Sequence, residues 1–281
     1  MSVVKAPPLQ LRCMQVFGGN RTLEQQFELP GVDAYLSSLA YGHGRGGDIH
    51  YVSTCGHGEI VRFLVADVAG HGAEVAEVAA RFRALVTRNI NRLDQSRLAR
   101  ALNTAFSVDN AGGRFITTLF VSYHRPSGHL IVCNAGHPRP LLYRARTARW
   151  QLLDHHFEPT ADELLNLPLG IIESTDYRQF AVRLEPGDTL LLYTDGLCDV
   201  RDRAGRVGEE RMLEAVDGAA PELLDAFAVK VRRTLGLFGP EHRPVDDETL
   251  FLVRPTERPF PPLRLRERVG SMGKMLGILP V

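Results

Sequence analysis

Two aspartates at the ends of a predicted β-hairpin carry the strongest chemical signal in this sequence. Asp48 precedes a strand-like run at residues 49–55, and Asp67 directly follows a second run at residues 59–66. Both runs are rich in β-branched and aromatic residues. If His57-Gly58 forms a two-residue turn, the antiparallel register places Asp48 opposite Asp67 at one edge of a sheet. Because adjacent carboxylates repel each other unless a cation lies between them, this edge is a candidate metal site.

Two more acidic positions have the same setting further along the chain. Asp195 follows the apolar run 190–193, and Asp246 precedes the strand-like run 249–253. In an antiparallel sheet the end of one strand and the start of its neighbour lie at the same edge, so all four acids are expected on one rim. Oxygen ligands without paired Cys or His suit Mg²⁺ or Mn²⁺ rather than Zn²⁺. Turn formation explains any single aspartate better, but the four together favour a metal site.

The composition is that of an ordinary enzyme-sized chain. Its 281 residues are 44% hydrophobic, with 33 basic and 33 acidic side chains, which is enough for one large domain or two small ones. Net neutrality argues against a nucleic-acid-binding surface as the main function. No stretch approaches the roughly 18 apolar residues of a membrane span, and the N-terminus lacks a signal pattern, so we expect a cytoplasmic protein. The four cysteines are far apart and are expected to be reduced.

The period of the apolar residues changes between helical and strand-like along the chain. Three- and four-residue spacing from Val75 to Ile90 predicts an amphipathic helix, and Ser96 is expected to cap a second helix at residues 96–107. Residues 146–178 are the least regular part. The other predicted elements are strands at 115–123, 129–133 and 140–144, a strand pair at 180–184 and 188–193, helices at 209–216 and 221–236, and a last strand at 249–254. This order predicts antiparallel sheet with helices on its outer faces.

The same patterns divide the chain into three parts. Residues 1–29 carry no strong period and are expected to form an N-terminal extension, because Pro30-Gly31 marks a turn before the core begins. Residues 30–254 form the predicted domain. Residues 255–281 are proline-rich and then basic, and we expect a C-terminal tail there. The alternatives for this tail are a frayed terminus and a short helix that docks on the core, on a partner or in a dimer contact.

Eight short motifs follow one another in order along the chain. They are Gly46-Gly47-Asp48, Ala66-Asp67-Val68-Ala69-Gly70-His71-Gly72, Phe115-Ile116-Thr117-Thr118-Leu119, Asn134-Ala135-Gly136-His137-Pro138, Pro168-Leu169-Gly170, Pro186-Gly187-Asp188, Tyr193-Thr194-Asp195-Gly196 and Asp246-Asp247-Glu248-Thr249. In this order they resemble the motifs of the PPM (type 2C) protein phosphatases, and most closely those of the bacterial SpoIIE-type branch. The resemblance runs from about Pro30 to Arg254.

The resemblance implies an α+β fold, a four-layer α-β-β-α sandwich of two antiparallel sheets flanked by helices, with two Mn²⁺ or Mg²⁺ ions at one end. By motif, Asp67 bridges the ions and the backbone carbonyl of Val68 completes one shell. Asp195 and Asp246 bind the other side of the centre, and Asp48 supports it directly or through water. The implied reaction is hydrolysis of phosphoserine or phosphothreonine in a protein by metal-activated water. By analogy, the branch suggests a phosphorylated anti-sigma-factor antagonist as substrate.

Histidines and one arginine are further candidates for the site. His71, in a glycine-flanked loop, is expected either to protonate the leaving serine or threonine oxygen or only to bind backbone. His137 is expected to fix a turn between two strands, with the neighbouring asparagine binding backbone. His155-His156 resembles a metal pair, but we discount it because adjacent strand residues point to opposite faces. Arg45 either meets the substrate phosphate or is an exposed arginine without a partner.

Three positions depart from the pattern of the branch. A second aspartate usually follows the Gly-Gly-Asp motif where this chain has Tyr51, serine is frequent where it has Ala69, and an apolar residue is usual where it has Glu248. The leading hypothesis is an active metal-dependent phosphatase. The missing acid at Tyr51 keeps a second hypothesis open, a catalytically weak module that binds a phosphoprotein or a regulatory partner. A hydrolase of small phosphate esters is the third.

Overall fold

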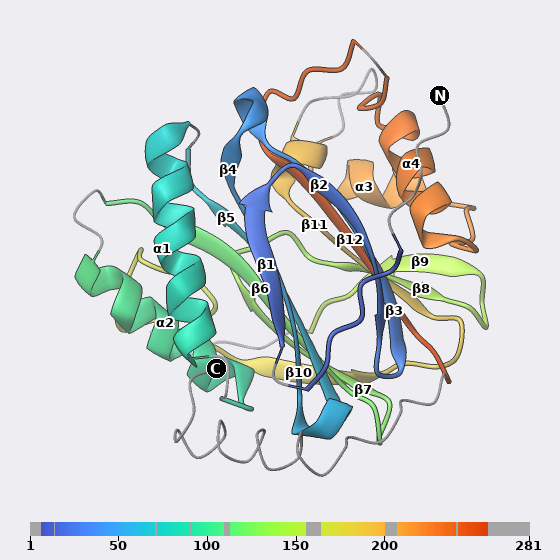
Figure 1. Cartoon of the computed structure of the whole chain (residues 1–281), viewed down its shortest axis with the longest axis horizontal. Coiled ribbons are helices and arrows are strands. Elements are labelled where there is room, and N and C mark those ends of the chain that lie inside the picture. Colours follow the sequence, from blue (N-terminus) through green and yellow to red (C-terminus); the bar gives the residue numbers. More distant parts are fainter. Residues whose placement is uncertain are drawn as a thin grey trace.

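Two antiparallel sheets stack face to face between two pairs of helices, as Figure 1 shows. This computed structural model describes residues 7–13, 15–70, 72–89, 92–109, 113–155, 164–199, 207–239 and 241–257. The helices α1 and α2 cover the outer face of one sheet, and α3 and α4 lie against the outer face of the other. This is the expected α-β-β-α sandwich, so the predicted fold class is confirmed.

The first sheet has the strand order β1-β4-β5-β6-β7-β10 and is covered by α1 (Ala73–Asn89) and α2 (Gln95–Asp109). In α1 the buried side chains Val75, Phe82 and Val86 recur at helical spacing and pack on the sheet, so burial of one face stabilises this helix. The strands are β1 (Val16–Arg21), β4 (Arg45–Cys55), β5 (Ile60–Val68), β6 (Ile116–His124), β7 (His129–Ala135) and β10 (Gln179–Arg183).

The second sheet has the order β2-β3-β12-β11-β8-β9 and is covered by α3 (Glu209–Val216) and α4 (Leu224–Thr234). Trp150 of β9 contacts the helical layer in two ways. Its ring stacks on Phe227 of α4, and its indole N–H donates to the Ala219 carbonyl over 2.8 Å. The strands are β2 (Leu23–Leu29), β3 (Val32–Leu39), β8 (Leu141–Arg144), β9 (Arg149–Leu152), β11 (Thr189–Tyr193) and β12 (Glu248–Pro255).

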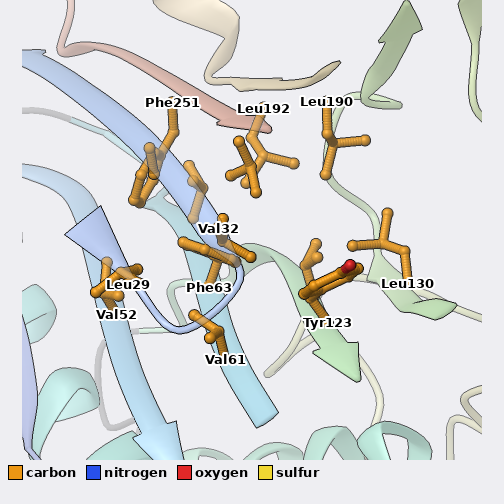
Figure 2. Close-up of a cluster of buried hydrophobic side chains, with 14 of the residues drawn as sticks. Leu29, Val32, Val52, Val61, Phe63, Tyr123, Leu130, Leu190, Leu192 and Phe251 are labelled. Carbon is orange, nitrogen blue, oxygen red and sulfur yellow. The ribbon is translucent and has the colours of Figure 1, made fainter. Parts of the chain in front are cut away.

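Apolar side chains from both sheets form the core between them, part of which Figure 2 shows. Phe63 of β5 meets Phe251 of β12 edge to face, with ring centroids 5.4 Å apart. Along β12, Phe251 points into this core while Leu250 and Leu252 point to the helical layer. Because each fully buried large side chain contributes about 1.5–3 kcal/mol, the core holds the two sheets in one fixed stacking.

The hairpin that motivates the metal hypothesis has the predicted register. Ile49 pairs with Ala66 and Cys55 pairs with Ile60, so Asp48 and Asp67 follow as the next opposite positions. The connection itself is longer than a two-residue turn, because Gly56–Gly58 form a 3₁₀ turn in which the amide of Glu59 donates to the carbonyl of Gly56. The extra residues are added symmetrically, so the register is unchanged.

The expected pairing of residues 180–184 with 188–193 is wrong. β10 pairs with β7 in the first sheet, whereas β11 pairs with β8 and β12 in the second. The turn between them carries the chain from one sheet to the other. Asp188 directs this crossing, because its buried carboxylate accepts hydrogen bonds from the Arg144 guanidinium and from the amide of Ala145, at the end of β8. A turn motif does not reveal which sheet the next strand joins.

The expected boundaries at both ends need correction. Residues 1–29 are not a simple extension, because β1 pairs with β4 and β2 pairs with β3 as the edge strands of the two sheets. Neither strand alternates cleanly, so only their long-range partners define them. At the other end, β12 continues through Pro255, and the amide of Thr256 donates to the carbonyl of Gly31. The predicted tail from Arg258 onward lies outside the described residues.

Two smaller expectations also change. Asp94 caps α2 in place of Ser96, because the Asp94 carboxylate accepts hydrogen bonds from the amides of Ser96 and Arg97. The irregular stretch 146–178 contains β9, a short strand that pairs with β8. In the part of the chain that the structure describes, we find no helix with the length and apolar character of a membrane span.

Candidate metal centre

Both sheets contribute acids to one end of the sandwich, which we call the acidic rim (Asp48, Asp67, Asp195 and Asp246). Asp48 and Asp67 come from the neighbouring strands β4 and β5 of the first sheet. Asp195 begins a 3₁₀ turn directly after β11, and Asp246 precedes its neighbour β12 in the second sheet. The pairing of strand ends with strand starts therefore gathers these acids, as the sequence predicts.

Two hydrogen bonds join the sheets at the rim. The Thr194 hydroxyl donates to Asp48 Oδ2 over 2.8 Å, and the Gly47 amide donates to Asp247 Oδ2 over 2.5 Å. Thr194 also accepts a hydrogen bond from the amide of Thr249, so its hydroxyl is fixed by both sheets. These contacts hold the strand that carries Asp48 against the strand ends that carry Asp195 and Asp246.

Close approach of backbone to side chains explains the glycines of the rim motifs. A Cβ at Gly46 would overlap the Asp247 carboxylate, and a Cβ at Gly196 would overlap the Asp247 carbonyl oxygen. A Cβ at Gly47 would lie 2.7 Å from the Val75 side chain. A larger residue at Gly46 would push β4 away from Asp247 of the second sheet, whereas one at Gly47 would displace α1 and one at Gly196 would displace the backbone before β12. The Gly-Gly-Asp and Asp-Gly motifs therefore serve the geometry of the acids.

The rim carries strong mutual repulsion between carboxylates. Burial, followed by the charges of Asp67 and Asp247, raises the pKa of Asp48 well above its usual range. Burial, followed by the charges of Asp195 and Asp246, does the same to the pKa of Asp67. Burial and the charges of Asp199 and Asp246 raise the pKa of Asp195 to about 6. These directions mean that a bound cation would stabilise the ionised rim.

The donor atoms of the rim fit a hard divalent cation. Asp48 Oδ1 is buried and has no hydrogen-bond partner, which leaves one carboxylate oxygen available for a ligand or for water. The ideal Cβ position of Gly47 lies 3.0 Å from the Val68 carbonyl oxygen and 3.4 Å from Asp67 Oδ1, so these two oxygens border the same space. Among the described residues, no three His, Cys, Asp or Glu side chains form a ready-made metal site. The rim is thus a set of neighbouring oxygen donors rather than a closed shell.

His137 joins the two sheets beside the rim, in a neutral form. Its Nε2–H donates to the Tyr193 carbonyl over 3.0 Å, so Nδ1 accepts from the Thr117 hydroxyl over 2.9 Å. Burial lowers the pKa of His137 to about 3. The Asn134 side chain bonds the amide and the carbonyl of His137, which confirms the predicted turn.

Of the remaining sequence candidates, the structure describes His155 and Arg45. His71 and His156 lie outside the described residues. The ring of His155 packs near Phe180, with centroids 5.6 Å apart. Arg45 is exposed, and it pairs across β1 and β4 with Arg21. Its role toward a substrate phosphate stays a prediction.

Several residues that support the rim are missed by sequence reasoning. The Asp247 carboxylate accepts hydrogen bonds from the amides of Gly47 and Tyr41. The Asp246-Asp247 pair in the sequence does not by itself predict these partners. Asn20 Nδ2 donates to the carbonyls of Gly46 and Ala76, so β1 fixes the start of β4 and of α1. Nothing in the local pattern of β1 points to this long-range role. Other supporting residues are Thr194, Asp199 and Arg114, which donates to the Ala69 carbonyl beyond Asp67.

A family profile accounts for the order of these motifs. The profile of Stage II sporulation protein E (SpoIIE) matches residues 57–256, which is more than half of the chain. The chain belongs to the SpoIIE family. The matched segment contains Asp67, Asp195 and Asp246, while Asp48 precedes it. The resemblance inferred from the motifs is thereby confirmed.

Two curated relatives share part of this SpoIIE-family chain. The phosphoserine phosphatase RsbU of Bacillus subtilis (strain 168) is 26% identical over 148 residues, which are 52% of this chain and 42% of RsbU. The phosphoserine phosphatase RsbP of the same organism is 26% identical over 141 residues, or 48% of this chain and 32% of RsbP. The alignments thus span less than half the length of either relative.

Solved structures share the SpoIIE-family fold. The structure of the RsbU and RsbW domains of Rv1364c from Mycobacterium tuberculosis has a TM-score of 0.70 at 24% identity, covering 92% of this chain and 71% of that one. RsbX in complex with magnesium has a TM-score of 0.60 at 16% identity, covering 83% of this chain and 100% of RsbX. At these identities the likeness concerns the fold alone, and one of the two relatives is a magnesium complex.

Proposed function

We propose that this protein is a metal-dependent serine/threonine phosphatase that holds two Mn²⁺ or Mg²⁺ ions at the acidic rim. The observation that carries the proposal is the convergence of Asp48, Asp67 and Asp195 at one end of the sandwich, where burial and the charges of neighbouring aspartates raise their pKa values. Such an arrangement is costly unless cations occupy it. Membership of the SpoIIE family and the phosphatase names of RsbU and RsbP support the same reaction.

In this proposal each acid has a separate role. Asp67 and the Val68 carbonyl would hold the ions from the first sheet, and Asp195 and Asp246 would hold them from the second. Asp48 supports the centre through its unpartnered Oδ1, while Thr194 holds Oδ2. When bound, the ions would supply a water of lowered pKa and offset negative charge on the phosphoryl oxygens.

The substrate side of the proposal rests on analogy. We propose phosphoserine or phosphothreonine in a protein as substrate, because RsbU is named a phosphoserine phosphatase. By analogy with the SpoIIE-type branch, a phosphorylated anti-sigma-factor antagonist is the first candidate. His71 is assigned to protonate the leaving oxygen. A cytoplasmic location belongs to the same proposal.

The position of Tyr51 favours an active enzyme over a catalytically weak binding module. Tyr51 is fully buried in the cluster beneath α1 and α2. Asp48, three residues earlier, bonds to Thr194 of the second sheet and so faces the other side of β4. The departure from the family pattern therefore does not remove a group that faces the rim donors.

Hydrolysis of p-nitrophenyl phosphate tests the proposal. We expect Mn²⁺-dependent turnover in the wild type and a loss of about a thousandfold in Asp67→Asn and in Asp195→Asn, because each variant removes charge from the centre. The matched control is Asp217→Asn, an exposed aspartate after α3, which should retain full activity. Equal rates in wild type, Asp67→Asn and Asp195→Asn would overturn the phosphatase assignment.

Substrate class needs a second comparison. A phosphoserine peptide and p-nitrophenyl phosphate should be offered to the same Mn²⁺-loaded protein at matched concentrations. A higher kcat/KM for the peptide would support a protein phosphatase. Preference for the small ester would favour the third hypothesis, a hydrolase of small phosphate esters, without affecting the metal assignment.

A further inference from the structure

A cavity of about 630 Å³ lies between the outer face of the second sheet and α4. Its floor comes from β2 and β3, and its other side comes from α4 and the segment that follows it. The volume falls within the range of small-molecule sites, roughly 300–1,000 Å³. The lining residues used below are Glu24, Tyr35, Val229, Arg232, Leu237, Phe238, His242 and Arg243.

A buried ionic cluster stands at the inner end of this cavity. Glu248, at the start of β12, accepts from Arg232 Nη1 over 2.5 Å through Oε2 and binds His242 Nε2 over 2.8 Å through Oε1. Arg232 Nη2 also donates to the Glu248 backbone carbonyl. The Arg232 and Glu248 side chains are only 7% and 2% exposed. Glu248 is also one of the three positions where the chain departs from the family pattern, so the carboxylate at the centre of this cluster is not part of that pattern.

The lining offers a buried hydrogen-bond donor beside the ionic cluster. Both carboxylate oxygens of Glu248 are used, whereas Arg232 Nε is buried without a partner. Among the described lining residues the carboxylate is that of Glu24, and burial, followed by the charge of Glu24, raises the pKa of Tyr35. Arg232 therefore gives the cavity a guanidinium N–H for a ligand, while the Nη1 of Arg243, a second lining residue, donates to the His242 carbonyl.

The rest of the lining is apolar. Leu237 and the half-exposed ring of Phe238 stand in the segment after α4, and Val229 faces the cavity from the helix. An aromatic or aliphatic body would lose contact with water against these side chains, at roughly 25 cal/mol for each Å² buried.

We infer that this cavity binds a small organic anion, a carboxylate or similar group on an apolar ring. The anion accepts hydrogen bonds from the guanidinium side, and the ring packs on Phe238 and Leu237. The site lies on the outer face of the second sheet, over β2 and β3, and not on the inner side where the rim acids meet. The inference does not depend on the phosphatase assignment.

Calorimetric titration of the metal-free full chain with 1-naphthoate and with the uncharged 1-naphthamide tests this site. Naphthoate should bind about tenfold more tightly, because one charge-assisted hydrogen bond contributes at least that factor. The variant Val229→Trp, which fills the cavity, should weaken naphthoate binding about tenfold. Its matched control, Val108→Trp on the exposed face of α2, should leave the affinity unchanged.

Two further variants keep the test decisive if Val229→Trp does not fold. Phe238→Ala removes a 47% exposed ring and should weaken the binding of both naphthoate and naphthamide, whereas Val108→Ala should leave both affinities unchanged. The double variant Arg232→Met/Glu248→Leu replaces the ion pair by apolar groups and should make the two affinities equal. Equal binding of naphthoate and naphthamide by the wild type, or unchanged binding in the cavity variants that fold, would overturn the inference.

Discussion

On the inner side of the sandwich, Asp48, Asp67 and Asp195 are neighbours, and the described residues include no salt bridge to any of them. On the outer side, by contrast, Glu248 forms ion pairs with both Arg232 and His242. Both groups lie near the start of β12. In the rim, burial and like charges act together, so the pKa values of the acids rise. In the outer cluster, each carboxylate oxygen has a basic partner.

The difference separates a site that needs an external cation from one that is complete within the chain. Unpaired buried carboxylates reduce the stability of the folded protein until a ligand neutralises them, whereas a paired carboxylate becomes costly only when its partner is removed. The same substitution, acid to amide, should therefore have opposite effects in the two places.

The largest contrast is expected at Glu248. Glu248→Gln should lower the free energy of unfolding by about 3 kcal/mol, because it leaves the buried Arg232 without its counter-charge. Urea unfolding measures this change, and the double variant Arg232→Met/Glu248→Leu should recover most of it. A loss below about 1 kcal/mol would mean that the cluster is electrostatically unimportant.

Metal binding should restore the stability that the folded protein loses through repulsion between the rim carboxylates. Mn²⁺ at about 100 times its dissociation constant should stabilise the wild type by about 2.7 kcal/mol, and chelation should reverse this. Thermal unfolding with and without Mn²⁺ measures the effect. Asp67→Asn should lose the response, while Glu248→Gln should retain it. A response that survives in Asp67→Asn would place the metal elsewhere.

The buried neutral side chain of His137 should make the stability of the folded protein depend on pH. The folded protein excludes the proton that the unfolded chain binds at His137 below pH 6.5, because burial lowers the pKa to about 3. Stability from this group is therefore complete above pH 6.5 and is lost as pH falls toward 3, by about 1.4 kcal/mol at pH 5.5.

Comparison with His137→Gln isolates this histidine. The raised pKa values of the rim acids act in the opposite direction in metal-free protein, but they are common to both proteins and cancel in the difference. Urea unfolding between pH 7.5 and pH 5.5 should show a smaller loss in the variant. Parallel pH profiles would assign the acid sensitivity to other groups.

The smallest and most diagnostic effect is expected at Asp48. Without metal, Asp48→Asn should raise the free energy of unfolding by about 1 kcal/mol, because it removes a buried like charge while the amide oxygen still accepts from Thr194. Urea unfolding in the presence of a chelator measures it. Destabilisation by as much as Glu248→Gln would show that the two clusters do not differ.

Local patterns were enough to predict much of the fold and the centre of the site. The position of the turn between the two strands gives the β4–β5 register, helical spacing gives α1, and residues 209–216 coincide with α3. The acidic rim follows from the rule that neighbouring antiparallel strands share an edge. The ordered motifs give the family, because each records a backbone or ligand requirement that a few residue types satisfy.

Only the tertiary structure decided which strands become neighbours and which polar groups meet across the sheets. No local pattern tells that β10 and β11 belong to different sheets, that Asn20 of an edge strand braces Gly46, or that Arg232 and His242 share Glu248. Local sequence sets the conformational preference of each segment. Partners distant along the chain are selected by packing of the whole core, because that is where the buried area and the desolvation costs are balanced.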